Sequence, residues 1–505
     1  MKNKIIFWID AGLLHFGIAK FVQDKTDAEL FTIYDLNNNL KKSFRNQKLV
    51  NFTKSWFFWD FVTKKNLKKP DLEYLSKFEN KYGINLWKLA HSERIFFDYN
   101  PFHKFTGNEI LSILEQECKF FESVLDETNP NFLITKTTDF HRNHLFAKLC
   151  QSRGIKVMML IPTRFGYRST ISTDLNETDE TWNLDEKLNF GSFESIEKYF
   201  RKYDRFKQTG DQKSGGTEKS ILSKLKPTIH WLSDTFDEEY LETYDHFGIT
   251  RIKALKNGIL SLMQSSYRKS FIDKNFLKIL PSNQKFIYFP LHVQPERNID
   301  LDAPYYSNQI EVVSKIAKSI PVDFVLFVKE HPNMRFRNWR NTDYYKKILS
   351  LPNVELLHPS ISPDEIIKKC ELAITIAGNA GLEAAFYGKP AIVFANMNYS
   401  RLPSVYRIKN IEDLPETINR ALKTKVQLSD LNQYAGIIEK NSFSFDEIDM
   451  DNKIMSEFHP AGFLISDNIS MKKFNEFLQK QKSYFELLAN EYIKKINQYE
   501  KLSKN

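Results

Sequence analysis

Residues 284–425 alternate between short apolar runs and amphipathic stretches without a break. The apolar runs are filled by Val, Ile, Leu and Phe, as is typical of strands buried on both faces: KFIYFPL, FVLFVKEHP, VELLHP, LAITIAG and PAIVFAN. Between them lie stretches of helical period: YYSNQIEVVSKIAKSI, YYKKILSLP, SPDEIIKKC and AGLEAAFYG. Nine elements in strict alternation predict a doubly wound α/β domain, in which helices cover both faces of a parallel sheet.

The first 165 residues carry a weaker version of the same pattern. IIFWI at 5–9 and ELFTIY at 29–34 are typical of strands, and residues 108–127 place apolar side chains at helical spacing. NPNFLIT and IKVMMLIP bracket a helix that should end at Gly154, which again implies a parallel sheet. The aromatic segment KSWFFWDF interrupts this pattern, and we expect it to be an insertion packed by its own side chains.

The length of 505 residues exceeds what one ordinary hydrophobic core accommodates and predicts two or three packed units. We expect an α/β domain over 1–165, a helical or linker insertion over 166–282, a second α/β domain over 283–428, and a polar helical segment over 429–505. Within the insertion, QTGDQKSGGTEKS at 208–220 has no periodicity and is typical of a flexible loop.

The chain carries 72 basic and 63 acidic residues, a net charge of +9 that permits an anionic partner without requiring one. A Lys-rich solvated surface explains the same balance, and the basic residues lack the interleaved aromatic side chains of a nucleic-acid site. The three cysteines, Cys118, Cys150 and Cys370, are too far apart to build a disulfide framework or a metal cluster, which favours a reducing compartment. No window approaches the roughly 18 apolar residues that span a bilayer, so we expect a cytoplasmic protein.

Ligands of an open parallel sheet bind beside the carboxyl ends of its strands. The loops that follow the strands of residues 284–425 are more polar than simple connections need to be, and they contain His292, Gln294, Glu296, Lys329, Glu330, His331, Arg335, Arg337 and His358. We therefore expect the ligand site of this domain along that edge.

The turn Gly378, Asn379, Ala380, Gly381 lies between an apolar strand and a helix. Glycines there let backbone amides approach an anion, so the turn is a candidate phosphate site, although tight helix-to-strand packing explains such glycines equally well. The spacing matches neither the dinucleotide fingerprint nor the Walker loop. Glu383, one turn into the helix, could accept hydrogen bonds from ribose hydroxyls or simply complement the helix dipole.

The segment Lys329, Glu330, His331, Pro332 follows a fully apolar strand. A histidine held by a following proline, beside a lysine and near Arg335, offers donors to the phosphate of a leaving group, where charge develops in the transition state. The alternative is a histidine that only satisfies carbonyl groups at the strand end. Gln294 and Glu296 could contact a base, a sugar or an acceptor, and Glu296 could instead pair with Arg297.

The first half offers titratable groups after two of its expected strands. They are Asp10 and His15 after the first, and Thr137, Thr138, Asp139, His141, Arg142 and His144 after LIT. Asp139, at a strand end beside two histidines, is the best candidate for a general base, although a helix N-cap is an equally ordinary role for it. No pair of acidic residues has the spacing of a metal site.

The later half of the chain contains four motifs in this order: FPLHVQPE at 289–296, KEHP at 329–332, LPNVELLHP at 351–359 and ITIAGNAGLEAAFYGKPAIVF at 374–394. Together they resemble the nucleotide-binding half of bacterial capsule polysaccharide biosynthesis glycosyltransferases, which include the β-Kdo transferases. This resemblance implies a GT-B architecture, with two Rossmann-like domains facing across a cleft, the donor on the later domain and the acceptor on the earlier one. It also implies that Lys329–Pro332 handle the donor phosphate and nucleotide, that 378–381 contact phosphate, and that no metal or other cofactor is needed. Ala377 and Asn379 stand where relatives often have threonine or serine, which puts a hydroxyl contact to phosphate in doubt.

The leading hypothesis is a glycosyltransferase that moves a sugar from a CMP- or UDP-linked donor to a surface polysaccharide or glycolipid acceptor, with Asp139 and His331 as catalytic residues. One alternative is a nucleotide-sugar epimerase of the UDP-N-acetylglucosamine 2-epimerase type, which would act without an acceptor. Another is a non-catalytic polysaccharide-assembly protein. The net charge and the basic final helix could favour peripheral contact with the inner face of a membrane, where lipid-linked acceptors are found.

Overall fold

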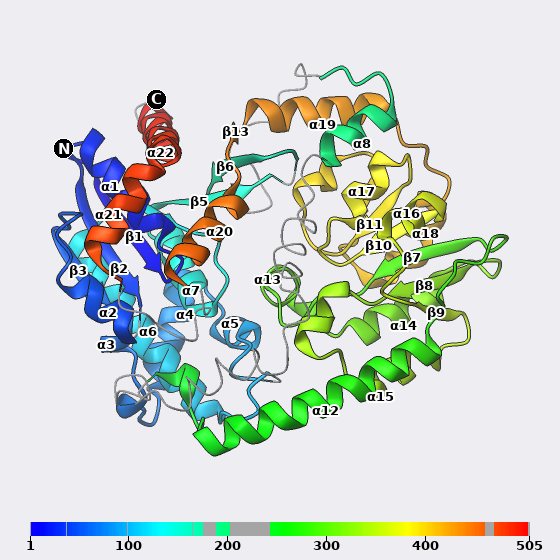
Figure 1. Ribbon diagram of the computed structural model, residues 1–505, viewed down its shortest axis with the longest axis horizontal. Coiled ribbons are helices and arrows are strands. Elements are labelled where there is room, and N and C mark those ends of the chain that lie inside the picture. Colours follow the sequence, from blue (N-terminus) through cyan, green and yellow to red (C-terminus); the bar gives the residue numbers. More distant parts are fainter. Residues whose placement is uncertain are drawn as a thin grey trace.

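A computed structural model describes residues 2–36, 38–97, 99–163, 165–174, 188–201, 243–459 and 469–502. The chain forms two α/β domains that lie side by side, each built around one sheet (Figure 1). The loop expected at 208–220 falls outside the described residues.

The second domain contains a six-stranded parallel sheet in the order β12-β11-β10-β7-β8-β9. Its strands are β7 (Phe286–Pro290), β8 (Val325–Lys329), β9 (Val354–Leu357), β10 (Leu372–Thr375), β11 (Ala391–Val393) and β12 (Val405–Arg407). Its helices include α13 (Arg297–Asp300), α14 (Gln309–Ser319), α15 (Thr342–Leu349), α16 (Pro363–Lys369), α17 (Ala380–Phe386) and α18 (Leu414–Ala421). The nine elements predicted from the alternation are confirmed, and β12 is an addition. This strand order is that of a Rossmann fold, with its switch point between β7 and β10.

The first domain repeats this order in a seven-stranded sheet, β13-β6-β5-β4-β1-β2-β3. The parallel strands are β1 (Lys4–Asp10), β2 (Glu29–Asp35), β3 (Lys54–Phe57), β4 (Phe132–Thr135) and β5 (Lys156–Pro162), and β6 (Arg168–Ser172) is antiparallel to β5. The helices are α1 (Leu14–Lys25), α2 (Asn38–Arg45), α3 (Phe58–Phe61), α4 (Leu72–Tyr82), α5 (Leu86–Ser92), α6 (Gly107–Thr128) and α7 (His141–Ser152). The prediction of two Rossmann-like domains is thus confirmed, and their switch points lie at β1/β4 and β7/β10.

The aromatic segment KSWFFWDF is not the insertion that the sequence suggested. Its first four residues form β3, which pairs with β2 at the edge of the first sheet, and the rest forms α3. Trp56, Phe58 and Trp59 are buried in the domain core, where the Phe58 ring lies 5.9 Å from that of Trp8 and 6.0 Å from that of Phe121. The aromatic side chains serve the main core rather than a core of their own, and that is why the expectation was wrong.

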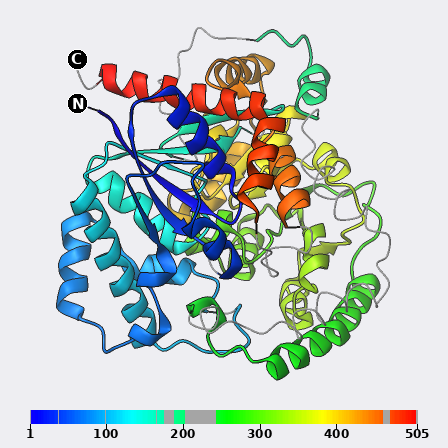
Figure 2. The ribbon, with the colours of Figure 1, turned by 60° about the vertical axis from the view of Figure 1, so that its left-hand side comes forward.

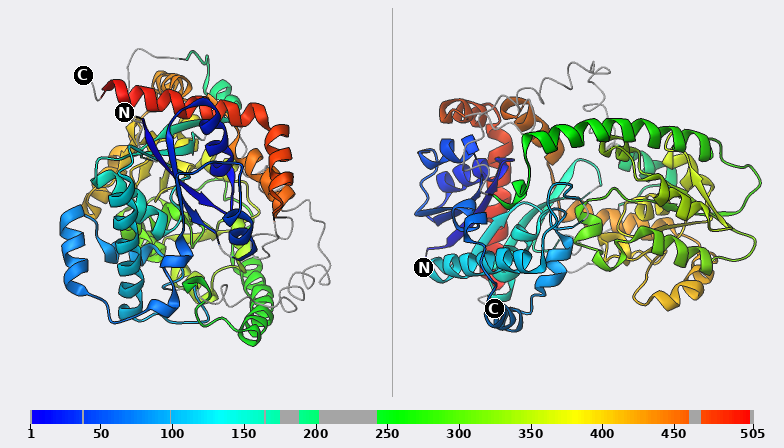
Figure 3. Two further views of the ribbon diagram at one scale, coloured as in Figure 1. Left: turned by 90° about the vertical axis from the view of Figure 1, so that its left-hand side faces the viewer. Right: turned by 90° about the horizontal axis from the view of Figure 1, so that it is seen from below.

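The chain passes between the domains more than twice. The helix α8 (Phe193–Arg201) precedes the second domain in sequence but packs in its core, where Ile196 is buried and the Phe200 ring lies 4.6 Å from that of Phe386. Tyr244 is again buried in the core of the first domain, and α12 (Arg251–Asn275) then runs from the first domain to the second along one side of the molecule (Figure 1). After α19 (Leu428–Lys440), β13 (Phe443–Ser444) joins the first sheet antiparallel to β6. The helices α20 (Glu447–Phe458), α21 (Met471–Lys480) and α22 (Lys482–Leu502) then cover the α1 face of the first domain (Figure 2 and Figure 3, left).

The contact between α22 and α1 depends on a glycine. A Cβ atom on Gly17 would lie 2.3 Å from the ring of Phe485, so a side chain there would force the two helices apart. The freed space lets Phe485 stack on Phe21 with ring centroids 5.7 Å apart. The final segment, for which the sequence left open either packing or a partner, therefore belongs to the core of the first domain.

In the described part of the chain, every helix is too short or too polar to traverse a bilayer.

Candidate functional site: the cleft between the two domains

His292 bridges the switch point of the second domain. It follows β7, and its Nε2 accepts a hydrogen bond of 3.2 Å from the backbone N–H of Ala377, which follows β10. The same nitrogen lies 3.2 Å from Oγ1 of Thr375, which in turn accepts the N–H of Gly378 at 3.2 Å. These bonds hold the glycine turn against the loop that leaves β7.

The neutral His292 ring has one N–H group that finds no acceptor among the described residues. Burial, and then the nearby His331 and Arg340, lower the pKa of His292 to about 3, so the ring is neutral. Because Nε2 accepts the Ala377 N–H, the single ring proton sits on Nδ1. Nδ1 is buried and has no hydrogen-bond partner among the described residues. Buried donors without partners are uncommon and invite a ligand acceptor.

The glycines of the turn are required by the protein's own packing. A Cβ on Gly378 would lie 2.7 Å from Thr375 Oγ1 and 3.0 Å from His292 Nε2, and one on Gly381 would lie 2.9 Å from the Tyr399 ring. The Tyr399 hydroxyl also donates to the carbonyl of Gly378. Asn379 and Ala380 connect the two glycines at the start of α17, and Glu383 lies half-buried one turn on.

Lys329 and His331 flank the end of β8. Lys329 is 2% exposed and makes no hydrogen bond or ion pair within the described part of the chain. Burial lowers its pKa to about 8. Burial, followed by the charges of Lys329, Arg340 and Arg337, lowers the pKa of His331 to about 4, and its Nδ1 accepts the N–H of Asn333 at 3.1 Å. The neutral ring therefore carries its proton on Nε2, so His331 can donate at pH 7.

Glu330 and Gln294, both expected to bind donor, are held inside the domain by Arg340. The Glu330 carboxylate is buried and accepts from Arg340 Nε at 2.9 Å and from the Tyr345 hydroxyl at 2.7 Å. The Gln294 oxygen accepts from Gln309 at 2.7 Å and from Arg340 at 3.2 Å. This network orients the loops after β7 and β8 rather than presenting the two side chains to a ligand.

The remaining expected donor residues occupy the outer part of these loops. The N–H of Glu296 donates to the Asp300 carboxylate at 3.0 Å, and its side chain is half-buried. Pro332 opens a short 3-10 turn, Pro332–Arg337, and Arg335 on that turn is exposed, with its guanidinium 4.5 Å from the Phe336 ring centroid. Arg335 is therefore the least enclosed of the predicted set.

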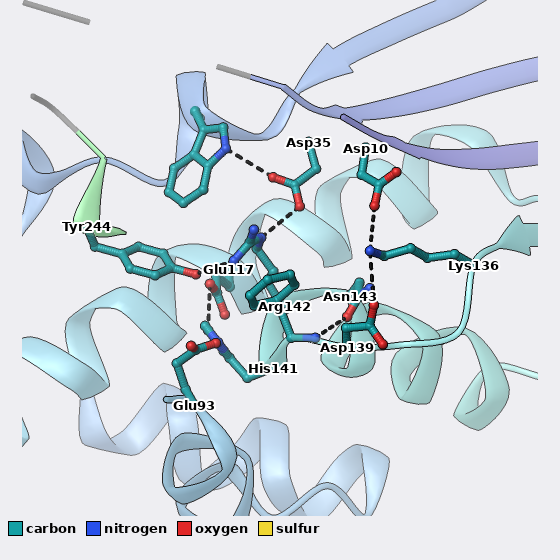
Figure 4. Close-up of polar contacts among 12 residues, drawn as sticks. Asp10, Asp35, Glu93, Glu117, Lys136, Asp139, His141, Arg142, Asn143 and Tyr244 are labelled. Carbon is teal, nitrogen blue, oxygen red and sulfur yellow. Dashed lines mark hydrogen bonds and ion pairs between the residues drawn. The ribbon is translucent and has the colours of Figure 1, made fainter. Parts of the chain in front are cut away.

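At the switch point of the first domain, ion pairs connect the loops that follow β1 and β4 (Figure 4). Lys136, directly after β4, lies 2.6 Å from an Asp10 oxygen at the end of β1 and 3.1 Å from an Asp139 oxygen. Burial alone would raise the pKa of Asp10, but Lys136 outweighs it and lowers that pKa. Asp139, the predicted base, is partly exposed and shares its cation with Asp10.

The two histidines near Asp139 in sequence are directed elsewhere. His141 lies between Glu93 at 2.5 Å and Glu117 at 2.9 Å, in the buried cluster of Figure 4. Burial opposes its charge, yet these carboxylates raise the pKa of His141 to about 10. His144 Nδ1 lies 2.9 Å from the Thr138 hydroxyl. Neither histidine contacts Asp139, and the N-cap of α7 is Phe140, so Asp139 does not fill the capping role either.

A cavity of about 430 Å³ lies between the domains. The first domain contributes residues of α5, α7, β5 and the end of β6, and the second contributes residues 297–306, 394–396 and 407–409. Arg297 links the two walls, because its Nε donates to the Thr138 carbonyl at 2.7 Å. The N–H of Ala395 donates to the carbonyl of Ile376 at 2.8 Å, which places this cavity next to the turn after β10.

The cavity wall is positively charged. It contains the cations Lys88, Lys148, Arg297, Arg407 and Lys409 and the two carboxylates Asp174 and Asp302. Asp302 pairs with Arg297 at 2.7 Å and 2.9 Å, whereas the other four cations form no ion pair within the described residues. Burial, and after it Lys148, Arg297 and Lys88, lower the pKa of His144 to about 3. Positive charge from both domains thus converges on one place.

Comparison with known proteins bears on the second domain. Residues 196–402 match the family described as capsule polysaccharide biosynthesis protein. This capsule polysaccharide family match confirms the resemblance inferred from the four motifs, and it contains every second-domain residue of the predicted site. No curated protein matches the sequence at a significant level.

Two solved structures are similar at low identity. The UDP-GlcNAc 2-epimerase of Methanocaldococcus jannaschii is 12% identical, with 86% of this chain and 98% of that chain covered and a TM-score of 0.25. The KpsC β-Kdo 2,7 transferase of Thermosulfurimonas dismutans is 13% identical, with 67% and 88% covered and a TM-score of 0.30. At such TM-scores, neither similarity supports an argument about the reaction.

Sequence reasoning passed over several residues of the cleft. It noted His292 without selecting it, and it overlooked Lys136 and Arg340. Lys136 and His292 carried a usable signal, since each follows a strand that borders a switch point. Arg407 ends β12 and Lys409 follows it, and the pattern did not predict this strand of three residues. Arg340 lies at the far end of the connection between β8 and α15, so only the folded chain reveals its partners.

Proposed function

We propose that the protein is a glycosyltransferase that takes a sugar from a nucleotide-sugar donor and passes it to an anionic glycan acceptor in the interdomain cleft. The donor phosphate would bind at the β7/β10 switch point. The observation that carries this proposal is the buried His292 Nδ1–H at that switch point, which has no hydrogen-bond partner among the described residues, together with the buried Lys329 at the end of the neighbouring strand β8. The capsule polysaccharide family match supports the same reaction class.

In this mechanism the acceptor hydroxyl oxygen attacks the anomeric carbon while the bond from that carbon to the phosphate oxygen breaks. Negative charge grows on the departing nucleotide, and the Lys329 ammonium and the His331 Nε2–H stabilise it. The acceptor proton passes to Asp139, whose carboxylate is oriented by Lys136. Donors from the chain itself balance the leaving-group charge, so the proposal invokes no metal.

The acceptor class follows from the charge of the cavity. Lys88, Lys148, Arg407 and Lys409 would favour a glycan that bears carboxylate or phosphate groups, as a surface polysaccharide or a lipid-linked glycan can. We propose CMP- or UDP-linked sugars as donors and the cytoplasmic side of the membrane as the place of action.

A two-step experiment tests this function. Thermal unfolding in the presence of CMP, UDP, GDP and ADP sugars should raise the melting temperature with one nucleotide class, because a ligand that binds the folded state stabilises it. Transfer from that donor to acidic oligosaccharides is then measured, and His331→Ala should lower kcat by at least about tenfold, or about 1.4 kcal/mol of transition-state stabilisation. The matched control is the exposed Lys347→Ala on α15.

Two results would contradict the proposal. Conversion of the donor to its C2 epimer in the absence of any acceptor would indicate an epimerase. Neither binding nor turnover with any nucleotide sugar would indicate a non-catalytic assembly protein.

A further inference from the structure

The helix α12, which links the two domains, turns Ser261, Arg268 and Ile272 toward the protein. It runs for 25 residues along the edge of the molecule, and only Ile272, near its end, is fully buried (Figure 1; Figure 3, right). Arg268 donates to the carbonyls of Asn338 and Trp339 at 3.2 Å and 3.0 Å, and Ser261 accepts a hydrogen bond from the Asn338 amide. Ser261, Arg268 and Ile272 recur at helical spacing, so they define the inward face.

The outward face of α12 is apolar. Its exposed large side chains are Ile252, Leu255, Ile259, Leu260, Leu262, Met263 and Tyr267, and their exposed fractions range from 42% at Leu255 to 81% at Ile252. At 100° per residue these positions fall on one stripe centred opposite Ser261. An amphipathic helix of a monomeric domain normally buries this stripe, and a contiguous exposed apolar patch marks a contact surface.

The helix is also strongly basic. It carries Arg251, Lys253, Lys256, Arg268, Lys269 and Lys274 against a single acid, Asp273. Asp273 is already engaged by Lys269 at 2.5 Å and by His358 at 3.1 Å. Lys256 lies within the apolar stripe, and Lys253 and Arg251 border it, so the first half of the exposed stripe has cations and no carboxylate.

We propose that α12 docks the protein on an anionic membrane surface, with the stripe from Ile252 to Tyr267 in the boundary between headgroups and acyl chains. A basic amphipathic helix with exposed apolar side chains has the chemistry that binds such a surface, and Lys and Arg stems can lie along the apolar layer while their charges reach lipid phosphates. A second copy of the chain fits less well, because a symmetric contact would bring the cations around Lys256 of both copies together. This inference does not depend on the proposed reaction.

Co-sedimentation of the full chain with vesicles tests the proposal. Binding should be at least about tenfold stronger to phosphatidylcholine vesicles that contain phosphatidylglycerol than to phosphatidylcholine alone, and it should weaken as salt rises. I259S/M263S and, separately, K253E/K256E should each lower binding to anionic vesicles by at least about tenfold. The matched controls change equivalent residues elsewhere, at the exposed Val322 (V322S) and at Lys347 (K347E).

Three further readouts keep the proposal falsifiable. Equal melting temperatures show that the variants remain folded, as expected for exposed positions. An environment-sensitive dye on Met263→Cys should shift to the blue with anionic vesicles. Wild-type binding by the α12 variants, no binding of the wild type to anionic vesicles, or self-association in sedimentation velocity that the α12 variants abolish would each overturn membrane docking.

Discussion

The two switch points of the molecule share one topology and differ in the side chains that connect their strand ends. In the first domain, Lys136 bridges Asp10 and Asp139, so each charge has a partner within the protein. In the second, a neutral His292 bridges the strands through a backbone N–H, and Lys329 at the end of the neighbouring β8 makes no ion pair among the described residues. The same strand order therefore carries a lysine between two carboxylates at one switch point and a neutral histidine at the other.

On the proposed function, this difference would let one fold serve two halves of a transfer reaction. Topology brings two loops together at each switch point, whereas the residues at the strand ends decide which charge the ligand must supply. A carboxylate held by lysine suits an acceptor hydroxyl, and buried cationic and neutral donors suit a phosphate.

The largest expected effect concerns stability. It tests whether Glu330 has a structural role at the switch point of the second domain. Arg340→Met leaves the buried Glu330 carboxylate without its cation, and we expect the free energy of unfolding to fall by about 3–5 kcal/mol in urea denaturation. Arg335→Met, on the exposed turn nearby, should change it by less than about 0.5 kcal/mol. A comparable loss in both variants would show that Arg340 has no special role.

The next effect tests the role of Asp139 at the switch point of the first domain. Asp139→Asn removes the proposed base while Asp10 still pairs with Lys136, so kcat should fall by about 100-fold or more with donor affinity unchanged. Steady-state kinetics together with calorimetric titration of the donor separate the two quantities. Asp126→Asn, an exposed carboxylate of the same domain, is the control. If kcat is retained, the Asp139 carboxylate has no part in the chemistry.

A smaller effect is expected at the glycine turn. The Cβ introduced by Gly378→Ala would press on Thr375 Oγ1 and His292 Nε2 and displace the bridge, and we expect donor nucleotide affinity to fall about thirtyfold, or about 2 kcal/mol. Gly258→Ala, where a Cβ meets nothing within 4 Å, should leave affinity unchanged. Unaltered affinity in Gly378→Ala would remove the turn from the donor site.

The smallest effect is a pH dependence of donor binding in the second domain. Burial lowers the pKa of Lys329 to about 8, so the ammonium is present below that pH and is lost above it. Donor affinity should therefore be constant below about pH 7 and fall about tenfold by about pH 9. Lys329→Arg keeps its charge and should flatten this profile. An unchanged slope in that variant would mean that another group controls binding.

Patterns in the sequence predicted five of the six strands of the second domain, because these strands form continuous apolar runs, and missed β12, which has three residues. They were weaker for the first domain, where β3, β6 and β13 lie toward the edges of the sheet and carry few residues each. The rule that ligands bind beside the carboxyl ends of parallel strands selected the loops that leave β7, β8 and β10. It could not foresee that Glu330 and Gln294 turn inward, since their shared partner Arg340 lies 10 and 46 residues away in sequence.

The route of the chain has a consequence for biosynthesis. Apart from α8 and the end of α12, the second domain is one stretch from β7 to α19, so a ribosome can release all of it before β13 and the helices that follow emerge. The first domain lacks an edge strand until Ser444 is made, and the pocket over Gly17 remains open until Phe485 arrives. The half that is synthesised first is thus the half that completes its core last, and until then the apolar surface of α1 lacks the helices that cover it.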